Sequence, residues 1–294
     1  MDLVAIGLKL KGLEIVPSAF DGFAQAPLSS RGACATAFVL YLVVLAVVKS
    51  AGLSPMRLRS LFFVHNALLS LASAALLAAF ISQLAPMLLE SGIDFAICSP
   101  RAFTRTLEWL YYLNYLFKYY ELLDTVFLAL KGKPTPFLHV YHHASVMALC
   151  FFELEGYASV QWVPITINLF VHVVMYYYYA LSAIGIRVWW KKYLTSLQIA
   201  QFVVDLVTIF YASFVLVSSS SEPGAVVVRK LFGISKGEEP CHGTVTAAFV
   251  GCFVITSYLV LFIRFFAQTY KTDPTKSSES KTPLRRSKRK VKKT

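Results

Sequence analysis

The residues best suited to chemistry are four histidines in two apolar stretches of the chain. His139, His142 and His143 occupy the run HVYHH, and His172 lies in the run NLFVHVVMY. Spacings of three and four residues place the first three near one face of a helix. An imidazole can bind a metal ion, act as a general acid or base, or attack as a nucleophile. A lone buried histidine is usually a structural residue, so this grouping indicates a functional site.

A third apolar stretch carries charged residues in the run KYYELLDT. On a helix, Lys118, Glu121 and Thr125 share one face, and Asp124 lies beside them. Ionisable side chains inside a bilayer are costly unless they are paired. The simplest interpretation is a buried ion-pair network that holds helices together, and a role in the functional site is compatible with it.

Two more helices are expected to carry polar stripes. Asn168 and His172 are four residues apart, and Tyr176 lies one turn further along. Tyrosines at the end of a span more often form an interfacial belt. The next stretch has polar residues at spacings of three, three and four, which either bond helix to helix or orient a histidine: Thr195, Gln198, Gln201 and Asp205.

The elements that must position these residues are transmembrane helices. Hydrophobic residues make up 57% of the 294, and charged residues make up 15%, against roughly 25% in soluble proteins. The sequence predicts an all-α, polytopic membrane protein with about seven spans, of which a hydropathy scan would miss the short fourth. They cover approximately residues 33–50, 62–89, 105–130, 137–153, 160–182, 195–219 and 244–268.

Basic loop residues predict the orientation. Lys131 and Lys133 follow the third span, and Arg187, Lys191 and Lys192 follow the fifth. Basic residues also follow the first and seventh spans, so all four groups fall on one side, which should be the cytoplasm. The N-terminus is then lumenal and the C-terminus cytoplasmic.

Two cysteines fall on the predicted lumenal side. Cys98 lies between the second and third spans, and Cys241 lies just before the seventh. Disulfides persist in an oxidising compartment, so we expect these two to pair.

The C-terminal residues differ in character from the rest of the chain. We expect residues 1–270 to form one transmembrane domain and residues 271–294 to form a basic, disordered cytoplasmic tail. The tail carries a net charge of +8, from ten basic and two acidic residues. It lacks interleaved aromatic residues, so an anionic membrane surface is the expected neighbour and nucleic acid is not.

The four polar runs together resemble the motifs of the ELO family of very-long-chain fatty acid elongases. The family motifs are KxxExxDT, HxxHH, NxxxHxxMY and TxxQxxQ. This chain has KYYELLDT at 118–125, HVYHH at 139–143, NLFVHVVMY at 168–176 and TSLQIAQ at 195–201. Order and spacing agree at every motif position. The resemblance implies a bundle of seven helices, six of which enclose a narrow tunnel for an acyl chain.

The resemblance also implies a reaction. ELO proteins condense a long-chain acyl-CoA with malonyl-CoA in the endoplasmic reticulum membrane, giving a 3-oxoacyl-CoA, carbon dioxide and CoA. No cofactor or metal is expected. The form of HxxHH that begins with His139 favours saturated or monounsaturated chains. The implied partners are the bilayer, a ketoacyl reductase, a dehydratase and an enoyl reductase, and a homodimer is left open.

Roles for the residues follow from this chemistry. No cysteine lies in a suitable context to be the nucleophile, because Cys150 is about two turns beyond His142. His142 is therefore the expected nucleophile, forming an acyl-imidazole, and His172 would assist decarboxylation or stabilise the enolate. A one-step mechanism with a histidine as general base would use the same residues. Four residues would fix the tautomers of the reacting histidines and stabilise charge: His139, His143, Asn168 and Gln198. A supporting polar network would consist of Lys118, Glu121, Asp124, Thr125, Tyr176, Gln198 and Gln201.

Two further assignments concern the cytoplasmic side. The basic residues that follow the third and fifth spans would meet the CoA phosphates: Lys131, Lys133, Arg187, Lys191 and Lys192. The chain ends KVKKT, in which Lys290 and Lys292 resemble the KxKxx retrieval signal of endoplasmic reticulum membrane proteins.

Two alternatives remain open at this point. Di-iron membrane desaturases and hydroxylases also use HxxHH, but they have more histidines than this chain, grouped in three sequence motifs. Here only four of six histidines converge, since His65 and His242 lie elsewhere in the sequence. A proton-coupled transporter would also carry intramembrane His, Asp and Glu. Such folds usually have repeats and broken helices, whereas the third, fifth and sixth spans contain only Pro164.

Overall fold

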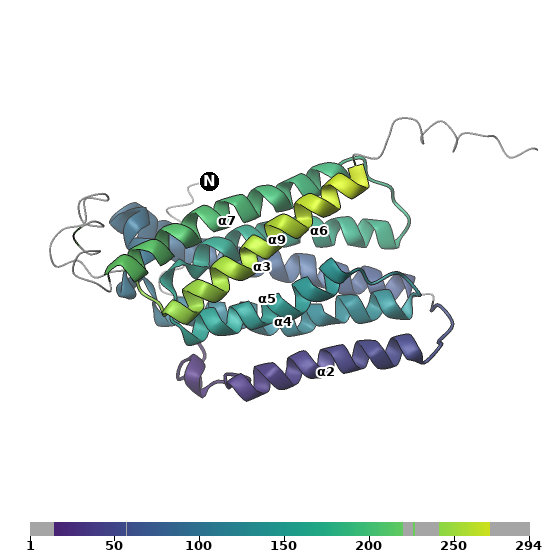
Figure 1. Cartoon of the computed structure of the whole chain (residues 1–294), viewed down its shortest axis with the longest axis horizontal. Helices are drawn as coiled ribbons and strands as arrows, with labels where there is room; N and C mark the ends of the chain where they lie inside the picture. Colours follow the sequence, from purple (N-terminus) through teal and green to yellow (C-terminus); the bar gives the residue numbers. More distant parts are fainter. Residues whose placement is uncertain (1–14, 57, 220–225, 227–240, 271–294) are drawn as a thin grey trace, which may run out of the picture.

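Seven long helices lie side by side in the described part of the computed structural model, which covers residues 15–56, 58–219, 226 and 241–270 (Figure 1). They are α2 (Arg31–Ser50), α3 (Arg59–Cys98), α4 (Arg105–Leu130), α5 (Phe137–Glu155), α6 (Trp162–Ala183), α7 (Lys191–Ser219) and α9 (Val245–Tyr270). Short 3₁₀ turns η1 (Phe23–Gln25), η2 (Pro100–Ala102) and η3 (Ser159–Gln161) join them. The prediction of an all-α, polytopic membrane protein is confirmed.

Five of the described helices are long and apolar enough to cross a membrane by length and composition: α2, α3, α6 together with η3, α7 and α9. The sequence predicted that only the fourth span would escape such a scan, and this was wrong because α4 escapes it too. Tyrosines and the charged residues Lys118, Glu121 and Asp124 lower the hydropathy of α4. Both exceptions are the helices that carry the densest polar motifs.

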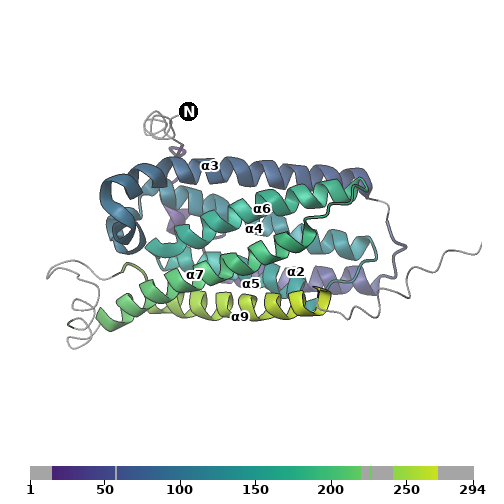
Figure 2. The ribbon, with the colours of Figure 1, turned by 90° about the horizontal axis from the view of Figure 1, so that it is seen from above.

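α3 is longer than predicted. The expected end at residue 89 was wrong, because the helix continues to Cys98 across a break at Gly92. Gly92 has a φ of 82°, a conformation that glycine adopts without a steric penalty. Figure 2 shows this end of α3 turning away from the axis of its long first part. The extra turns bring Cys98 to the end of the bundle where α9 begins.

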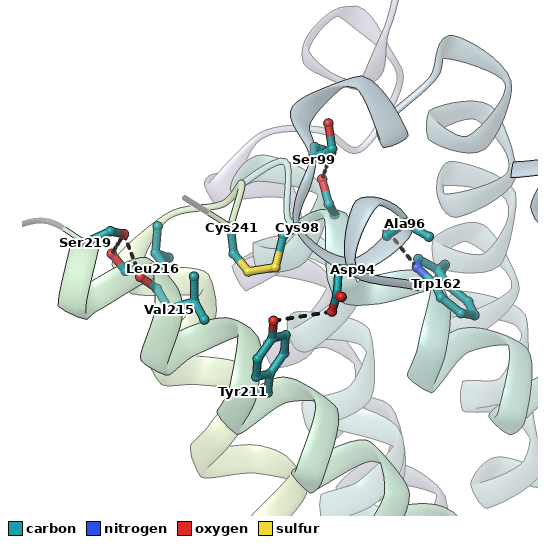
Figure 3. Close-up of a disulfide and its surroundings, with 11 residues drawn as sticks. Asp94, Ala96, Cys98, Ser99, Trp162, Tyr211, Val215, Leu216, Ser219 and Cys241 are labelled. Atoms are coloured by element: carbon teal, nitrogen blue, oxygen red, sulfur yellow. Dashed lines mark hydrogen bonds between the residues drawn. A yellow bond between two sulfur atoms is a disulfide. The ribbon is translucent and has the colours of Figure 1, made fainter. Parts of the chain in front are cut away.

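A disulfide joins Cys98 and Cys241 at this end (Figure 3). Hydrogen bonds hold the same region together: Trp162 Nε1 donates to Ala96 O at 2.9 Å, and Ser159 Oγ donates to Ser99 O at 3.0 Å. The disulfide closes a loop of 143 residues, and in the chain-entropy model longer loops give the larger stabilisation. We call this the disulfide end, and the end with Lys131 and Lys191 the basic end.

The helices pack as a bundle with one outlier. α3 packs most extensively against α6, α7 packs against α9, and α5 lies between α4 and α9. α2 contacts α4 and α5 from outside, at the lower edge of Figure 1. Its outward residues are exposed and apolar, as expected for a helix facing lipid. The fully buried core is aromatic and aliphatic, and includes Phe80, Tyr111, Tyr115, Met147, Phe151, Leu169 and Tyr258.

The segment before α2 packs against α4 at the disulfide end. Phe20 and Phe23 are buried there, and the Phe23 backbone N–H donates to Glu108 Oε1 at 2.7 Å. The hydroxyls of Tyr112 and Tyr115 donate to backbone carbonyls of the same segment, each at 3.0 Å. These two tyrosines of α4 therefore bond to main chain, and they fix the direction in which the chain enters α2.

Candidate active site

A buried ion pair connects α4 to α6. Lys118 and Glu121 are each 2% exposed, and Lys118 Nζ lies 3.1 Å from Glu121 Oε1. Lys118 also donates to Asn168 Oδ1 at 3.1 Å. Buried charges are tolerated when they are paired and when additional hydrogen bonds complete their coordination. The pair predicted from KYYELLDT is thus present, and it fixes the amide of Asn168.

His172 faces the same carboxylate from α6. Its Nδ1 lies 3.3 Å from Glu121 Oε1, which is ion-pair distance, although the two atoms are not aligned as a hydrogen bond. The ring is 4% exposed. Glu121 therefore lies between the Lys118 ammonium and the His172 imidazole, and it connects the two helices that carry them.

Asp124 forms a second buried network. Tyr176 Oη donates to Asp124 Oδ2 at 2.8 Å, and His65 Nε2 lies 2.6 Å from Asp124 Oδ1. His143 Nε2 is 3.9 Å from Asp124 Oδ2. The carboxylate gathers side chains from α3, α5 and α6, so it sets the relative position of three helices and the orientation of the His143 ring.

The three histidines of HVYHH lie together on α5. The ring centroids of His139 and His143 are 4.5 Å apart, and those of His142 and His143 are 5.5 Å apart. His143 is buried, whereas His142 is only partly buried. Tyr258 of α9 packs against His142 with ring centroids 4.8 Å apart, and its hydroxyl donates to the His142 carbonyl at 3.2 Å.

Two cavities meet at His142. The larger, about 390 Å³, opens toward the basic end and is lined by His139, His142, His143 and His172. The smaller, about 60 Å³, runs toward the disulfide end and is lined mostly by aliphatic and aromatic side chains. Four residues line both cavities: His142, Asn168, Gln201 and Phe202. The arrangement joins a larger chamber that contains the four histidines to a smaller passage, with His142 at the junction.

Six helices, α3 to α7 and α9, provide the side chains of these cavities together with η3 and Pro136 before α5, and α2 provides none. This division agrees with the arrangement implied by the resemblance to elongases.

Comparison with known proteins decides the family. The ELO family, also described as GNS1/SUR4, matches residues 26–278. The chain belongs to the ELO family of fatty acid elongases.

Its relatives carry matching names. The chain is 40% identical over 277 residues to "Putative fatty acid elongase 1" of Schizosaccharomyces pombe, covering 93% of this chain and 80% of the relative. It is 44% identical over 217 residues to "Putative fatty acid elongase 2" of the same organism, covering 74% and 57%. It is 34% identical over 207 residues to "Fatty acid elongase A" of Dictyostelium discoideum, covering 70% of each.

In this elongase the polar stripe of α7 contacts α6 and itself. Gln198 Nε2 donates to Met175 Sδ at 3.6 Å, and Gln201 Nε2 donates to Asp205 Oδ2 at 3.3 Å. The sequence left two interpretations of these polar residues, bonds from helix to helix or orientation of a histidine. Gln198 bonds to the neighbouring helix and Gln201 bonds along its own helix, and neither glutamine bonds to a histidine among the described residues. Thr125 turns the other way, toward α2, with its Oγ1 2.7 Å from Tyr41 Oη.

The five basic residues assigned to CoA are spread around the basic end of the elongase. Lys191 lines the larger cavity. Lys131 Nζ lies 3.8 Å from the ring centre of Phe62, a residue that lines the same cavity. Lys192 is exposed, with its Nζ 5.8 Å from the Phe266 ring centre, and Lys133 and Arg187 are exposed. Lys290, Lys292 and the rest of the predicted tail lie outside the described residues.

Sequence reasoning missed two site residues of the elongase. His65 is 2% exposed and pairs with Asp124, and Tyr258 packs on His142. A histidine in an otherwise apolar span was the available signal for His65. Nothing in the sequence distinguishes Tyr258 from the other fifteen tyrosines.

Within the described residues of the elongase, no group of three or more His, Cys, Asp or Glu side chains is arranged to hold a metal ion. The expectation that the enzyme needs no cofactor stays a prediction.

Proposed function

We propose that this protein is a 3-oxoacyl-CoA synthase that condenses a saturated or monounsaturated long-chain acyl-CoA with malonyl-CoA. The observation that carries the proposal is the position of His142 at the junction of the two cavities. We assign the CoA end of the substrate to the larger chamber, which opens at the basic end, and the acyl chain to the smaller passage, which runs among aliphatic and aromatic side chains toward the disulfide end. The thioester that joins them then lies beside the His142 ring.

In the first half-reaction, a ring nitrogen of His142 attacks the thioester carbonyl carbon. The carbon–sulfur bond breaks, and CoA leaves as a thiol after taking the imidazole proton. The acyl group remains on His142 as an acyl-imidazole. Among these rings His142 is the partly buried one, whereas His143 and His172 are buried, with His143 Nε2 3.9 Å from Asp124 Oδ2 and His172 Nδ1 3.3 Å from Glu121 Oε1.

In the second half-reaction, malonyl-CoA loses carbon dioxide and becomes an enolate. The enolate carbon attacks the acyl carbonyl, the carbon–nitrogen bond breaks, and the imidazole of His142 leaves and takes up one proton from the solvent, which restores it and releases 3-oxoacyl-CoA. His172, held near Glu121 at 3.3 Å, supplies positive charge or a proton to the enolate oxygen. His139 and Asn168 line the same chamber and complete its donor and acceptor groups.

The basic side chains at the mouth of the chamber receive the CoA phosphates. Lys191 lines the chamber directly, and Lys131, Lys133, Arg187 and Lys192 surround it. A cytoplasmic basic end follows from the positive-inside rule, with a lumenal N-terminus and the disulfide in the oxidising lumen. Family membership supports the endoplasmic reticulum membrane as the location, and the reductases and dehydratase of the elongation cycle as partners. A homodimer remains part of this proposal.

The experiment is condensation by the purified full-length protein, without added metal. Radiolabelled malonyl-CoA is supplied with saturated and monounsaturated acyl-CoAs. Wild type should give products two carbons longer, and His142→Ala should give none. His242→Ala is the matched control, because His242 lies at the disulfide end beside Cys241 and away from both cavities. Failure of wild type to elongate any chain, or stoichiometric iron in the active protein, would overturn the proposal.

A second measurement separates the two-step mechanism from general-base catalysis. Acyl-CoA alone, without malonyl-CoA, should release one equivalent of CoA and add the acyl mass to the peptide that contains His142. A general base would leave the peptide unmodified, and CoA release would then require malonyl-CoA.

A further inference from the structure

The narrow passage that extends from His142 is not uniformly apolar. Apart from the residues of the reacting centre and Gln161, whose Nε2 donates to Ala158 O at 2.9 Å, three polar side chains line it: Asn114, Glu153 and Asp205. They come from α4, α5 and α7, so they approach the passage from three sides. A saturated acyl chain has no hydrogen-bonding group to offer any of them.

Asp205 is the most enclosed of the three. It is fully buried, and Gln201 Nε2 donates to its Oδ2 at 3.3 Å. Its other oxygen, Oδ1, has no hydrogen-bond partner among the described residues. A buried acceptor without a donor costs free energy, so such atoms are normally paired by protein, water or ligand. Asp205 lies one helical turn beyond Gln201, on the side away from the histidines.

Asn114 has a similar unmatched acceptor. It is 1% exposed, and its Nδ2 contacts Cys150 Sγ at 3.6 Å, while Oδ1 has no partner in the described structure. Asn114 lies one turn before Lys118 on α4. Both free atoms are oxygens, so this part of the passage offers acceptors and calls for a donor.

Glu153 is the one of the three that lies furthest from His142 along the passage. It follows His142 by eleven residues on α5, which is about 16 Å along the helix axis. Its carboxylate is partly buried and makes no hydrogen bond or ion pair with the described residues, whereas Glu155 nearby is paired with Arg31 at 2.7 Å. The two glutamates are therefore chemically alike but differently placed, since only Glu153 lines the passage.

We propose that the passage accepts acyl chains with a hydroxyl group in the half far from the thioester, and that this hydroxyl donates to Asp205 or Glu153. A hydroxyl group adds one small polar group to the chain and supplies the missing donor. A hydroxyl close to the thioester would instead lie among the histidines and gain nothing from these acceptors. The inference rests on the proposed function, because it assigns this passage to the acyl chain.

The test is competition within one reaction. The purified full-length protein receives malonyl-CoA with equal amounts of a saturated acyl-CoA and a hydroxylated acyl-CoA of the same length, and mass spectrometry gives the product ratio. Separate reactions use a hydroxyl near the thioester, near the middle, and at the far end. The ratio is internal to each reaction, so it does not depend on how much enzyme is folded.

We expect a middle or terminal hydroxyl to compete at least as well as the saturated chain, and a hydroxyl near the thioester to compete poorly. Glu153→Leu should lower the ratio for the terminal hydroxyl about tenfold, the effect of about one lost hydrogen bond. Asp205→Leu should do the same for the hydroxyl nearer the middle. Glu155→Leu is the matched control on the same helix and should leave every ratio as it is in wild type.

Three results would overturn the inference. Elongation of the saturated chain with rejection of every hydroxylated chain would do so, and so would ratios that neither leucine variant changes, as expected if water fills these acceptors. Both results leave the proposed function intact. Absence of product from all chains, including the saturated one, would instead overturn the proposed function and this inference with it.

Discussion

His172 on α6 lies with its Nδ1 3.3 Å from Glu121 Oε1 on α4. The same carboxylate oxygen is 3.1 Å from Lys118 Nζ, so one buried acid is shared by two basic groups. Glu121 therefore has a structural role, through its ion pair with Lys118, and a proposed chemical role, through His172. The two roles can be separated by mutation.

Glu121→Gln should destabilise the protein and abolish condensation. Removing one partner of a buried ion pair leaves an uncompensated charge, which costs about 3–5 kcal/mol. Thermal unfolding in detergent measures this loss. Adding Lys118→Met to Glu121→Gln should recover stability, because it removes the orphaned ammonium, but it should not recover activity, because His172 still lacks its carboxylate. Recovery of activity in the double variant would show that Glu121 acts on Lys118 alone.

Tyr176→Phe and His65→Phe should each weaken the network around Asp124. Tyr176 donates to Asp124 Oδ2 at 2.8 Å and His65 lies 2.6 Å from Oδ1, so each variant leaves one buried oxygen short of a partner, at about 1–3 kcal/mol. Because both act on one carboxylate, the double variant should show a coupling energy of about 0.5–3 kcal/mol in unfolding measurements. Strict additivity would mean that Asp124 does not connect the two residues.

The sequence predicted a large part of this arrangement, because spacing along a helix determines which residues share a face. HVYHH was expected to present its histidines together, and the rings of His139 and His143 do lie 4.5 Å apart. Contacts between helices could not be predicted in this way. The approach of His65 to Asp124 depends on how α3 crosses α4, and the packing of Tyr258 on His142 depends on where α9 lies.

Some element boundaries also required the structure. Hydropathy falls near residue 89, so the second span was expected to end there. α3 continues to Cys98 because only Gly92 departs from helical dihedral angles, and the chain is helical again after it. The extended helix ends at Cys98, whose disulfide partner lies 143 residues further along the chain. The sequence did predict this pairing, because its topology places both cysteines on one side of the membrane, but it did not predict the helical extension that carries Cys98 to its partner.

Replacing Cys98 and Cys241 together by serine should lower the free energy of unfolding by about 2–5 kcal/mol. Condensation should survive below the unfolding temperature, because the disulfide lies at the end of the bundle opposite the histidines. Activity and thermal unfolding measured on the same preparation compare the two effects. Loss of activity in protein that remains folded would instead connect this end of the bundle to the chemistry.

Lys191→Glu should raise the KM for both CoA substrates and leave kcat less affected. Lys191 lines the larger cavity, so reversing its charge places a carboxylate near the expected position of the CoA phosphates. The wild-type KM should rise with ionic strength, and that dependence should weaken in the variant. Lys49→Glu is the control, because Lys49 lies at the end of α2 and outside both cavities. Equal changes in KM for the two variants would attribute the effect to the net charge of the surface.

Ile209→Trp should shorten the longest chain that the enzyme accepts. Ile209 is buried on α7 and lines the narrow passage beyond Asp205, so a larger side chain there removes space at the far end and leaves the histidine chamber intact. Products from a series of saturated acyl-CoAs should shift to shorter lengths, while the rate for the shortest substrates stays near that of wild type. Phe210→Trp is the matched control, since Phe210 is exposed on the next position of the helix and faces away from the passage. An unchanged length distribution in Ile209→Trp would mean that the acyl chain does not extend along this passage, and the orientation of the substrate would have to be reversed.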